Sequence, residues 1–231
     1  KNIVIPDSVT QIGIGAFSGC GELKSIVIPN NVTFIGDRAF SGCKHLKSIV
    51  IPNSVTEIGD GAFLRCDGLT SATIGNSVTS MGYRAFAGCS GLENVTIGKS
   101  VTSIGGYAFQ GCSSLTGVTI GNGVTSMGMY TFLNCTSLTR IIIPDSVTSI
   151  GPGAFLNCTS LTNVLMGNSI TTIGEVAFYE CGKLTAVYFK GNAPKLLGEM
   201  AFFDPSVIYY KPGTTGWTNP WGGRPTKEWV E

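Results

Sequence analysis

Hydrophobic and polar positions along this chain return with one fixed period. The phenylalanines at Phe17, Phe40, Phe63, Phe86, Phe109, Phe132, Phe155 and Phe178 recur at every twenty-third position. The same spacing separates all eight cysteines: Cys20, Cys43, Cys66, Cys89, Cys112, Cys135, Cys158 and Cys181. Gly13 through Gly174 and Leu23 through Leu184 form two further columns in register. Four such columns do not arise by chance, so the chain is an array of repeats.

One unit shows which elements the pattern predicts. Residues 26–28 are an apolar β-branched run, which favours a strand whose first and third side chains share one face. Pro29-Asn30 indicates a turn, and residues 32–35 form a second short extended piece. Residues 37–43 are too few for a full helix, and we expect one helical or 3₁₀ turn there.

A single unit of this kind is not stable alone. Each fully buried apolar side chain contributes about 1.5–3 kcal/mol, whereas ordering the backbone costs about 1–2 kcal/mol per residue. Stacking completes the burial and pairs each strand with the next in a parallel ladder. Eight units end in cysteine, and a degenerate ninth carries Gly198, Ala201 and Phe202 with the spacing changed to 24. The sequence predicts a β-rich α/β solenoid of 23-residue turns, with parallel strands and short helical or 3₁₀ segments.

The 23-residue spacing is lost in the C-terminal tail, which contains all three tryptophans, Trp217, Trp221 and Trp229. A solenoid must cover its last open turn, and bulky apolar residues do so. We therefore expect a repeat domain over residues 1–204 and an aromatic cap over residues 205–231. An alternative is that the tail aromatics, together with Tyr188, form a platform on which sugars stack.

The unit I-P-x-S-V-T-x-I-G-x-x-A-F-x-x-C-x-x-L, as in residues 143–161, resembles the leucine-rich repeats of the BspA-like family of bacterial surface proteins. The resemblance covers about residues 1–204. It implies a right-handed leucine-rich-repeat superhelix, a secreted or cell-surface setting in a bacterium, and adhesion to protein ligands such as host matrix proteins. The family's repeats carry no catalytic residues to transfer to this chain. A passive spacer that displays another domain is a further alternative.

Charge argues against some classes of partner. Fifteen Lys and Arg against fourteen Asp and Glu give a formal net charge of +1. Nucleic-acid binding needs a basic stripe, so we expect no nucleic-acid partner. No apolar run approaches the roughly 18–20 residues of a membrane-spanning helix. The chain begins with Lys1, and we interpret this as the cut end of a longer precursor.

The cysteine column admits three interpretations. A spacing of 23 does not fit a zinc site, which uses closely spaced cysteine pairs. Stacking would nevertheless bring successive cysteines within bridging range. We expect free, buried thiols that pack as small hydrophobic groups beside the phenylalanines, with disulfides or a metal as the alternatives.

No catalytic set emerges from the polar residues, so we expect no enzyme, no cofactor and no metal. His45 is the only histidine, and its neighbours Lys44 and Leu46 place it in a variable, solvated loop. The inward-facing cysteines cannot pair with it as nucleophiles. Glu175, Glu180 and Glu199 gather loosely near the C-terminal end, and we interpret them as surface charge.

The outward face of the first strand of each unit is the candidate binding surface. One outward column consists of Val4, Val27, Val50, Thr73, Thr96, Thr119, Ile142, Leu165 and Tyr188. Its side chains enlarge toward the C-terminal end, and Arg140 interrupts the polar column beside it. We expect Ile142, Leu165 and Tyr188, edged by Arg140, to form a binding patch. The alternative is that valine and threonine are there only as good strand residues.

The first turn has no preceding partner. Residues 2–5 form the first strand, and we expect Ile12, Phe17 and Leu23 behind it to lie open to water. Unpaired apolar edges recruit other strands. The sequence therefore predicts self-association or fraying at the N-terminal end.

Overall fold

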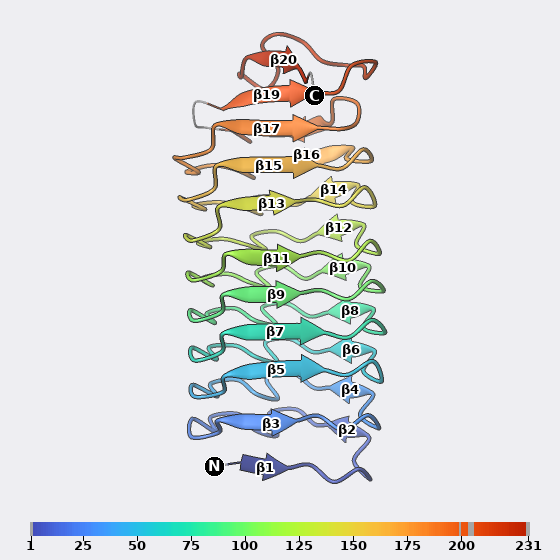
Figure 1. Ribbon diagram of the computed structural model, residues 1–231, viewed down its shortest axis with the longest axis vertical. Coiled ribbons are helices and arrows are strands. Elements are labelled where there is room, and N and C mark those ends of the chain that lie inside the picture. The colour runs from blue at the N-terminus through green and yellow to red at the C-terminus, as the bar shows by residue number, and fades with distance from the viewer. Residues whose placement is uncertain (1, 199, 203–205, 230–231) are drawn as a thin grey trace.

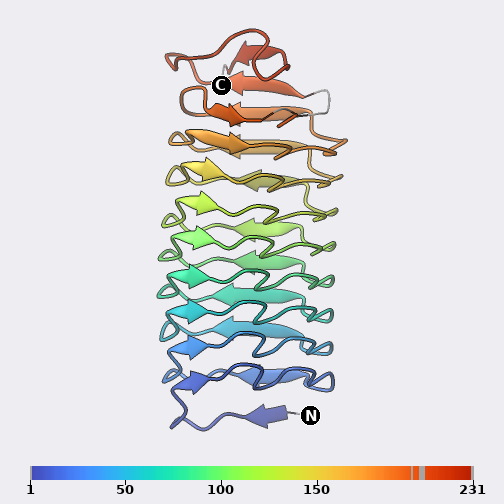
Figure 2. The ribbon, with the colours of Figure 1, turned by 180° about the vertical axis from the view of Figure 1, so that it is seen from behind.

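The computed structural model describes residues 2–198, 200–202 and 206–229. These residues form a solenoid with a long strand on one side of each turn, a short strand on a second side and an irregular third side. In Figure 1 the long strands run from left to right in front, the short strands run back behind them, and the chain climbs. This path is a right-handed coil, and Figure 2 shows the short strands from the opposite side.

All strands that pair along the solenoid do so in parallel, each with the strand one turn away. The long strands are β1 (Asn2–Val4), β3 (Ser25–Val27), β5 (Ser48–Ile51), β7 (Ser71–Ile74), β9 (Asn94–Thr96), β11 (Gly117–Thr119), β13 (Arg140–Ile142), β15 (Asn163–Met166), β17 (Ala186–Phe189), β19 (Val207–Tyr210) and β20 (Thr226–Glu228). The short strands are β2 (Gln11–Ile12), β4 (Phe34–Ile35), β6 (Glu57–Ile58), β8 (Ser80–Met81), β10 (Ser103–Ile104), β12 (Ser126–Met127), β14 (Ser149–Ile150), β16 (Thr172–Gly174) and β18 (Lys195–Leu197).

The two sides differ in continuity. The short strands form one sheet of nine. The long strands form three sheets: β1 with β3, then β5 to β11, then β13 to β20. Among the described residues no strand pairing joins β11 to β13, so the third sheet begins at β13, although β11 lies one turn below it.

The predicted alternation of the strands is confirmed. Ile26 and Ile28 are buried in the core, whereas Val27 between them is 78% exposed. The periodic turns and their parallel ladders are likewise as the sequence predicts.

The expected helical turn over residues 37–43 is wrong, and the described residues contain no helix. Arg38 and Gly42 have positive φ angles of 51° and 73°, which interrupt any right-handed helical run. Their N–H groups donate to the carbonyls of Asp60 and Leu64 in the next turn. The third side is therefore bonded from turn to turn like a sheet, and the fold is a β-solenoid without an α component.

A stack of phenylalanines occupies the centre of the solenoid. The rings from Phe17 to Phe178 follow one another at centroid separations of 4.8 to 5.5 Å, nearly parallel. Phe202 continues the stack at 5.2 Å from Phe178, although the chain between these two is longer by one position. Each such pair contributes about 0.5–1.5 kcal/mol beyond burial.

The cysteine column runs beside this stack, and seven of its eight members are buried, with Cys20 half-buried. All eight are free thiols in the structure. Each thiol from the second turn onward donates to the phenylalanine carbonyl of the preceding turn, as from Cys112 Sγ to Phe86 O at 3.3 Å. The column therefore links adjacent turns as well as filling space.

The C-terminal tail extends the solenoid before it closes it. β19 pairs with β17 and β20 pairs with β19, so the sheet gains two more strands. Trp221 then lies 6.0 Å from Phe202, the last ring of the stack. The expected boundary between residues 204 and 205 lies outside the described residues.

The N-terminal turn is better covered than the sequence suggests. Ile12 and Leu23 are buried, so the expectation that they lie open is wrong, because the second turn covers them. Phe17 is half-buried, while Val4 is 87% exposed. Ile3, Val4 and Phe17 line an open apolar hollow at this end.

Because its buried thiols are stable only in the neutral form, the fold loses stability at alkaline pH. Burial raises the pKa of the Cys112 thiol to about 12 and also raises the pKa of Cys135 and Cys158. In an unfolded chain these thiols titrate near pH 8.5. The unfolded state therefore loses protons first, so this stabilisation is complete below about pH 8.5 and is lost above it, by about 1.4 kcal/mol per thiol and pH unit.

We predict that urea unfolding midpoints stay level from pH 7 to 8.5 and fall steeply by pH 10. As a control, thiol titration of the denatured chain without reductant should give close to eight groups. Midpoints that do not change through pH 10 would contradict the burial of neutral thiols.

At the N-terminal end β1 has one edge without a strand partner, since among the described strands it pairs only with β3. We expect a polypeptide of residues 1–231 to self-associate through this edge, or to fray there, while its C-terminal end, which the tail covers, does neither. Light scattering and hydrogen exchange measure the two outcomes. A strictly monomeric chain whose residues 2–20 are as protected as residues 95–120 would show that the edge is stable alone.

Candidate binding surface on the long strands

The predicted patch forms a column across β13, β15 and β17. Ile142 is in register with Leu165, and Leu165 with Tyr188. Their side chains point outward because Ile141, Val164 and Val187, their immediate neighbours, are buried. Ile142 is 57% exposed, and Leu165 and Tyr188 are half-buried.

A groove of about 340 Å³ lies along this column. Arg140, Ile142, Leu165, Tyr188 and Trp229 line it, so the structure brings all four predicted patch residues together. Apolar walls with one cationic group at the rim are typical of protein interfaces.

Trp229 reaches the groove through the last ladder of the sheet. It follows β20, and its backbone N–H donates to the carbonyl of Tyr210 at 2.7 Å. The indole ring lies 5.2 Å from the ring of Tyr188. The sequence predicts Trp229 in the cap with the other two tryptophans, but the structure places it on the face of the long strands.

Tyr209 is a member of the surface that sequence reasoning missed. Its ring stacks on Tyr188 at 4.9 Å with an interplanar angle of 16°. The register pairs these two residues although they are 21 positions apart. The sequence shows an aromatic residue in a β-branched run. Because the 23-residue spacing is lost in the tail, however, the column to which this residue belongs could not be predicted.

Arg140 lies on β13, the first strand of the third sheet, and is exposed. Within the described part of the chain it forms no ion pair. Its guanidinium group is therefore available for a carboxylate on a partner, in the bidentate geometry that arginine favours.

Trp217 and Trp221 do not form the open platform that the carbohydrate alternative requires. Trp221 is only 9% exposed and packs edge-on against Phe189 and Trp217. One face of Trp217 stacks on Tyr210 at 5.3 Å. These two rings are packed at the end of the core, and a sugar has no free ring face of Trp221 to cover.

The polar residues considered as reactive groups are separated. His45 is exposed, with Nδ1 2.6 Å from the carbonyl oxygen of Gly21 and 3.9 Å from Glu22. Glu175 and Glu180 are exposed, and Glu199 lies outside the described residues. In the part of the chain that the structure describes, no three metal-ligating side chains gather. No helix within that part is long and apolar enough to cross a membrane.

The family model described as "BspA type Leucine rich repeat region" matches in six copies over residues 1–116 and 82–208. No curated protein matches the chain.

Among solved structures, a leucine-rich repeat protein from Bacteroides ovatus is 29% identical with a TM-score of 0.72, over 90% of this chain and 63% of that one. A leucine-rich repeat protein of T. pallidum is 28% identical with a TM-score of 0.60, over 69% of this chain and 73% of that one. A leucine-rich cell surface protein of Faecalibacterium prausnitzii is 28% identical with a TM-score of 0.51, over 87% and 66%. The chain thus spans less than two thirds of the Bacteroides protein.

Proposed function

The chain belongs to the BspA-type leucine-rich-repeat family, and we propose that it is a non-catalytic, secreted or cell-surface repeat module that binds a protein ligand. The observation that carries the proposal is the groove on the long strands, where Tyr188, Trp229 and Arg140 meet. A cell-surface setting agrees with the name of the Faecalibacterium protein. Host extracellular-matrix proteins are the ligand class we propose first.

The groove suits protein binding because the side chains that would contact the partner are already held in place in the unbound protein. Tyr188 is fixed by its strand register and by ring contacts with Tyr209 and Trp229. Little side-chain entropy is then lost on binding. Tyrosine, tryptophan and arginine are the residues that most often dominate binding energy at protein interfaces.

Apolar neighbours complete the surface. Ile142 and Leu165 extend the aromatic cluster as far as β13, the first strand of the third sheet. A partner that covers these two side chains removes their apolar surface from water, which favours binding. Arg140 at the rim favours a partner with negative charge.

We predict that Tyr188→Ala weakens binding to a matrix ligand at least tenfold, because truncating an interface anchor costs about 2 kcal/mol or more. The measurement is surface binding to a panel of immobilised matrix and serum proteins, followed by titration of any that bind. Val27→Ala is the matched control, since Val27 occupies the same outward column near the other end and should leave affinity unchanged.

Two outcomes would oppose the proposal. One is the absence of binding above background to every protein of the panel. The other is equal weakening by Val27→Ala and Tyr188→Ala, which would show that the ligand does not use the groove.

A further inference from the structure

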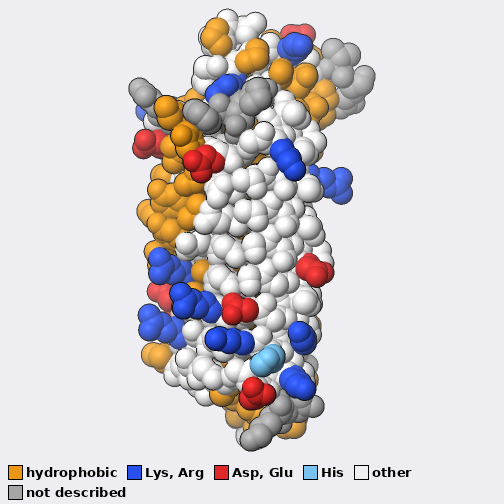
Figure 3. Space-filling model, turned by 90° about the vertical axis from the view of Figure 1, so that its left-hand side faces the viewer, with side chains coloured by type: hydrophobic (Ala, Val, Ile, Leu, Met, Phe, Trp, Pro, Cys, Tyr) orange, Lys and Arg blue, Asp and Glu red, His pale blue; other side chains and the backbone are white. Residues whose placement is uncertain are grey.

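A second surface lies on the irregular third side of the solenoid, away from the groove. Figure 3 shows a strip of hydrophobic side chains along the left edge of the molecule, with Lys and Arg side chains gathered below it. We call this surface the basic–aromatic edge. Its members come from successive turns: Arg38, Arg65, Tyr83, Arg84, Tyr107 and Tyr130.

Five of the six edge residues, all except Tyr83, occupy backbone positions that favour glycine. Arg65, Arg84 and Tyr107 have φ angles of 54°, 56° and 57°. Other turns place Gly61, Gly88 and Gly153 at the equivalent positions, as the conformation favours. Non-glycine residues in this region are strained, and such strain is concentrated at binding and catalytic sites.

The arginine side chains are held in place without being neutralised. The guanidinium carbon of Arg84 lies 5.1 Å from the ring centroid of Tyr83 and 5.3 Å from that of Tyr107. Arg65 extends over Gly88 of the next turn, whose missing side chain leaves it room. Neither arginine forms an ion pair with a described residue.

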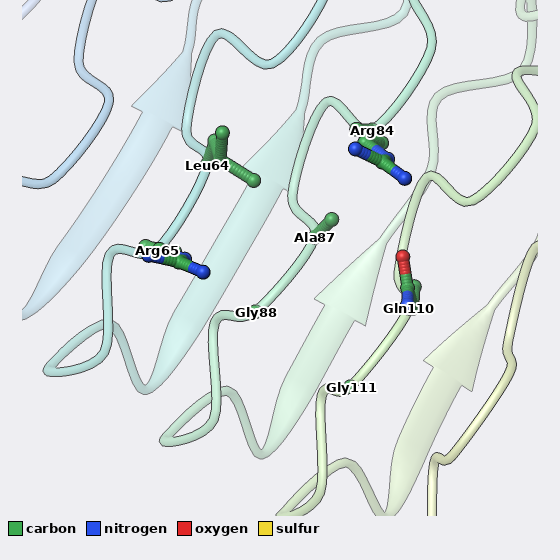
Figure 4. Close-up of a pocket in the computed structure, with 7 residues that line it drawn as sticks. All are labelled: Leu64, Arg65, Arg84, Ala87, Gly88, Gln110 and Gly111. Carbon is green, nitrogen blue, oxygen red and sulfur yellow. The ribbon is translucent and has the colours of Figure 1, made fainter.

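These side chains border a hollow of about 320 Å³. Figure 4 shows Arg65 and Arg84 on neighbouring turns, with Arg84 directed toward the turn that carries Gln110. The nearby carboxylates of Asp37 and Asp60 accept backbone N–H groups of the next turn. The hollow therefore presents two guanidinium groups that have no ion-pair partner among the described residues, and one carboxamide.

We infer that the basic–aromatic edge binds a linear anionic polysaccharide. Arg38 and Arg84 occupy the same position of the repeat two turns apart, about 10 Å along the ladder, and Arg65 lies on the turn between them, four positions later in its unit. Arginine binds carboxylates and sulfates through paired N–H groups while its plane stacks on tyrosine.

The tyrosines extend the site beyond the charges. Tyr107 and Tyr130 lie on the two turns after Arg84, with their rings 4.9 Å apart. Sugar rings present C–H faces that pack on such aromatic surfaces. Farther along this edge Glu175 and Glu180 carry negative charge with no arginine beside them, so the site ends before them. From Arg38 to Tyr130 it spans about 19 Å, four turns of the ladder.

The test uses an oligogalacturonide hexamer as the probe, with neutral maltohexaose and hexaglutamate as comparisons, measured by calorimetry at two salt concentrations. We expect the anionic sugar to bind, more weakly at higher salt, and the neutral sugar not to bind. Hexaglutamate that binds as tightly as the sugar would overturn the assignment in favour of an acidic peptide.

The variant Arg65→Gly/Arg84→Gly removes two charges and relieves two strained positions. We expect at least tenfold weaker sugar binding together with a melting temperature that is unchanged or higher. Tyr107→Gly should weaken binding severalfold without changing its salt dependence. The control Lys24→Gln/Lys47→Gln removes two exposed charges from neighbouring turns elsewhere and should change affinity less than twofold.

The inference fails if the anionic hexamer does not bind, or if the lysine control weakens binding as much as the arginine variant. Tyr188→Ala should leave sugar binding intact. Failure of the polysaccharide site and failure of the protein-binding groove are therefore distinguishable.

Discussion

The stack of phenylalanine rings is the contact on which the register of the whole solenoid depends. Each ring can face the next only if every turn returns to the same position around the solenoid axis, which holds the length of the turn constant along the chain. Where the chain departs from this length, between Phe178 and Phe202, the extra residue is absorbed without breaking the stack. Thiol-to-carbonyl bonds and parallel ladders then connect each turn to its neighbours.

Because each turn contacts only the next, the outward positions are free to differ along the rod. The same backbone position carries valine near the N-terminal end and tyrosine near the C-terminal end of the long-strand column. On the third side it carries glycine in one turn and arginine or tyrosine in another. The two proposed binding surfaces are variations of this kind on a uniform core, set on different sides of the coil.

Much of this fold could be predicted from the sequence because the core repeats in strict register. Inward residues such as Ile26 and Phe109 recur at the same positions, and their burial follows from the period alone. The third side could not be predicted, since a string such as residues 37–43 does not reveal that Arg38 adopts a left-handed conformation. Its conformation is imposed by hydrogen bonds to the next turn, which overrule local preference.

The candidate site could likewise be predicted only where its residues follow the 23-residue period. Ile142, Leu165 and Tyr188 were identified because they follow the period, whereas Tyr209 and Trp229 come from the tail, where the period is lost. The position of Trp229 depends on the pairing of β20 with β19, which no local sequence pattern predicts. Burial of Ile12 and Leu23 was likewise underestimated, because one neighbouring turn is enough to cover them.

The central claim, that the phenylalanine stack holds the turns in register, is tested most directly by Phe109→Ala in the middle of the rod. The account predicts a loss of about 3–5 kcal/mol in the free energy of unfolding. It also predicts that hydrogen exchange rises mainly in the turns around Phe86 and Phe132, which lie against this ring. A loss below about 1 kcal/mol, with amide protection in those turns unchanged, would contradict it.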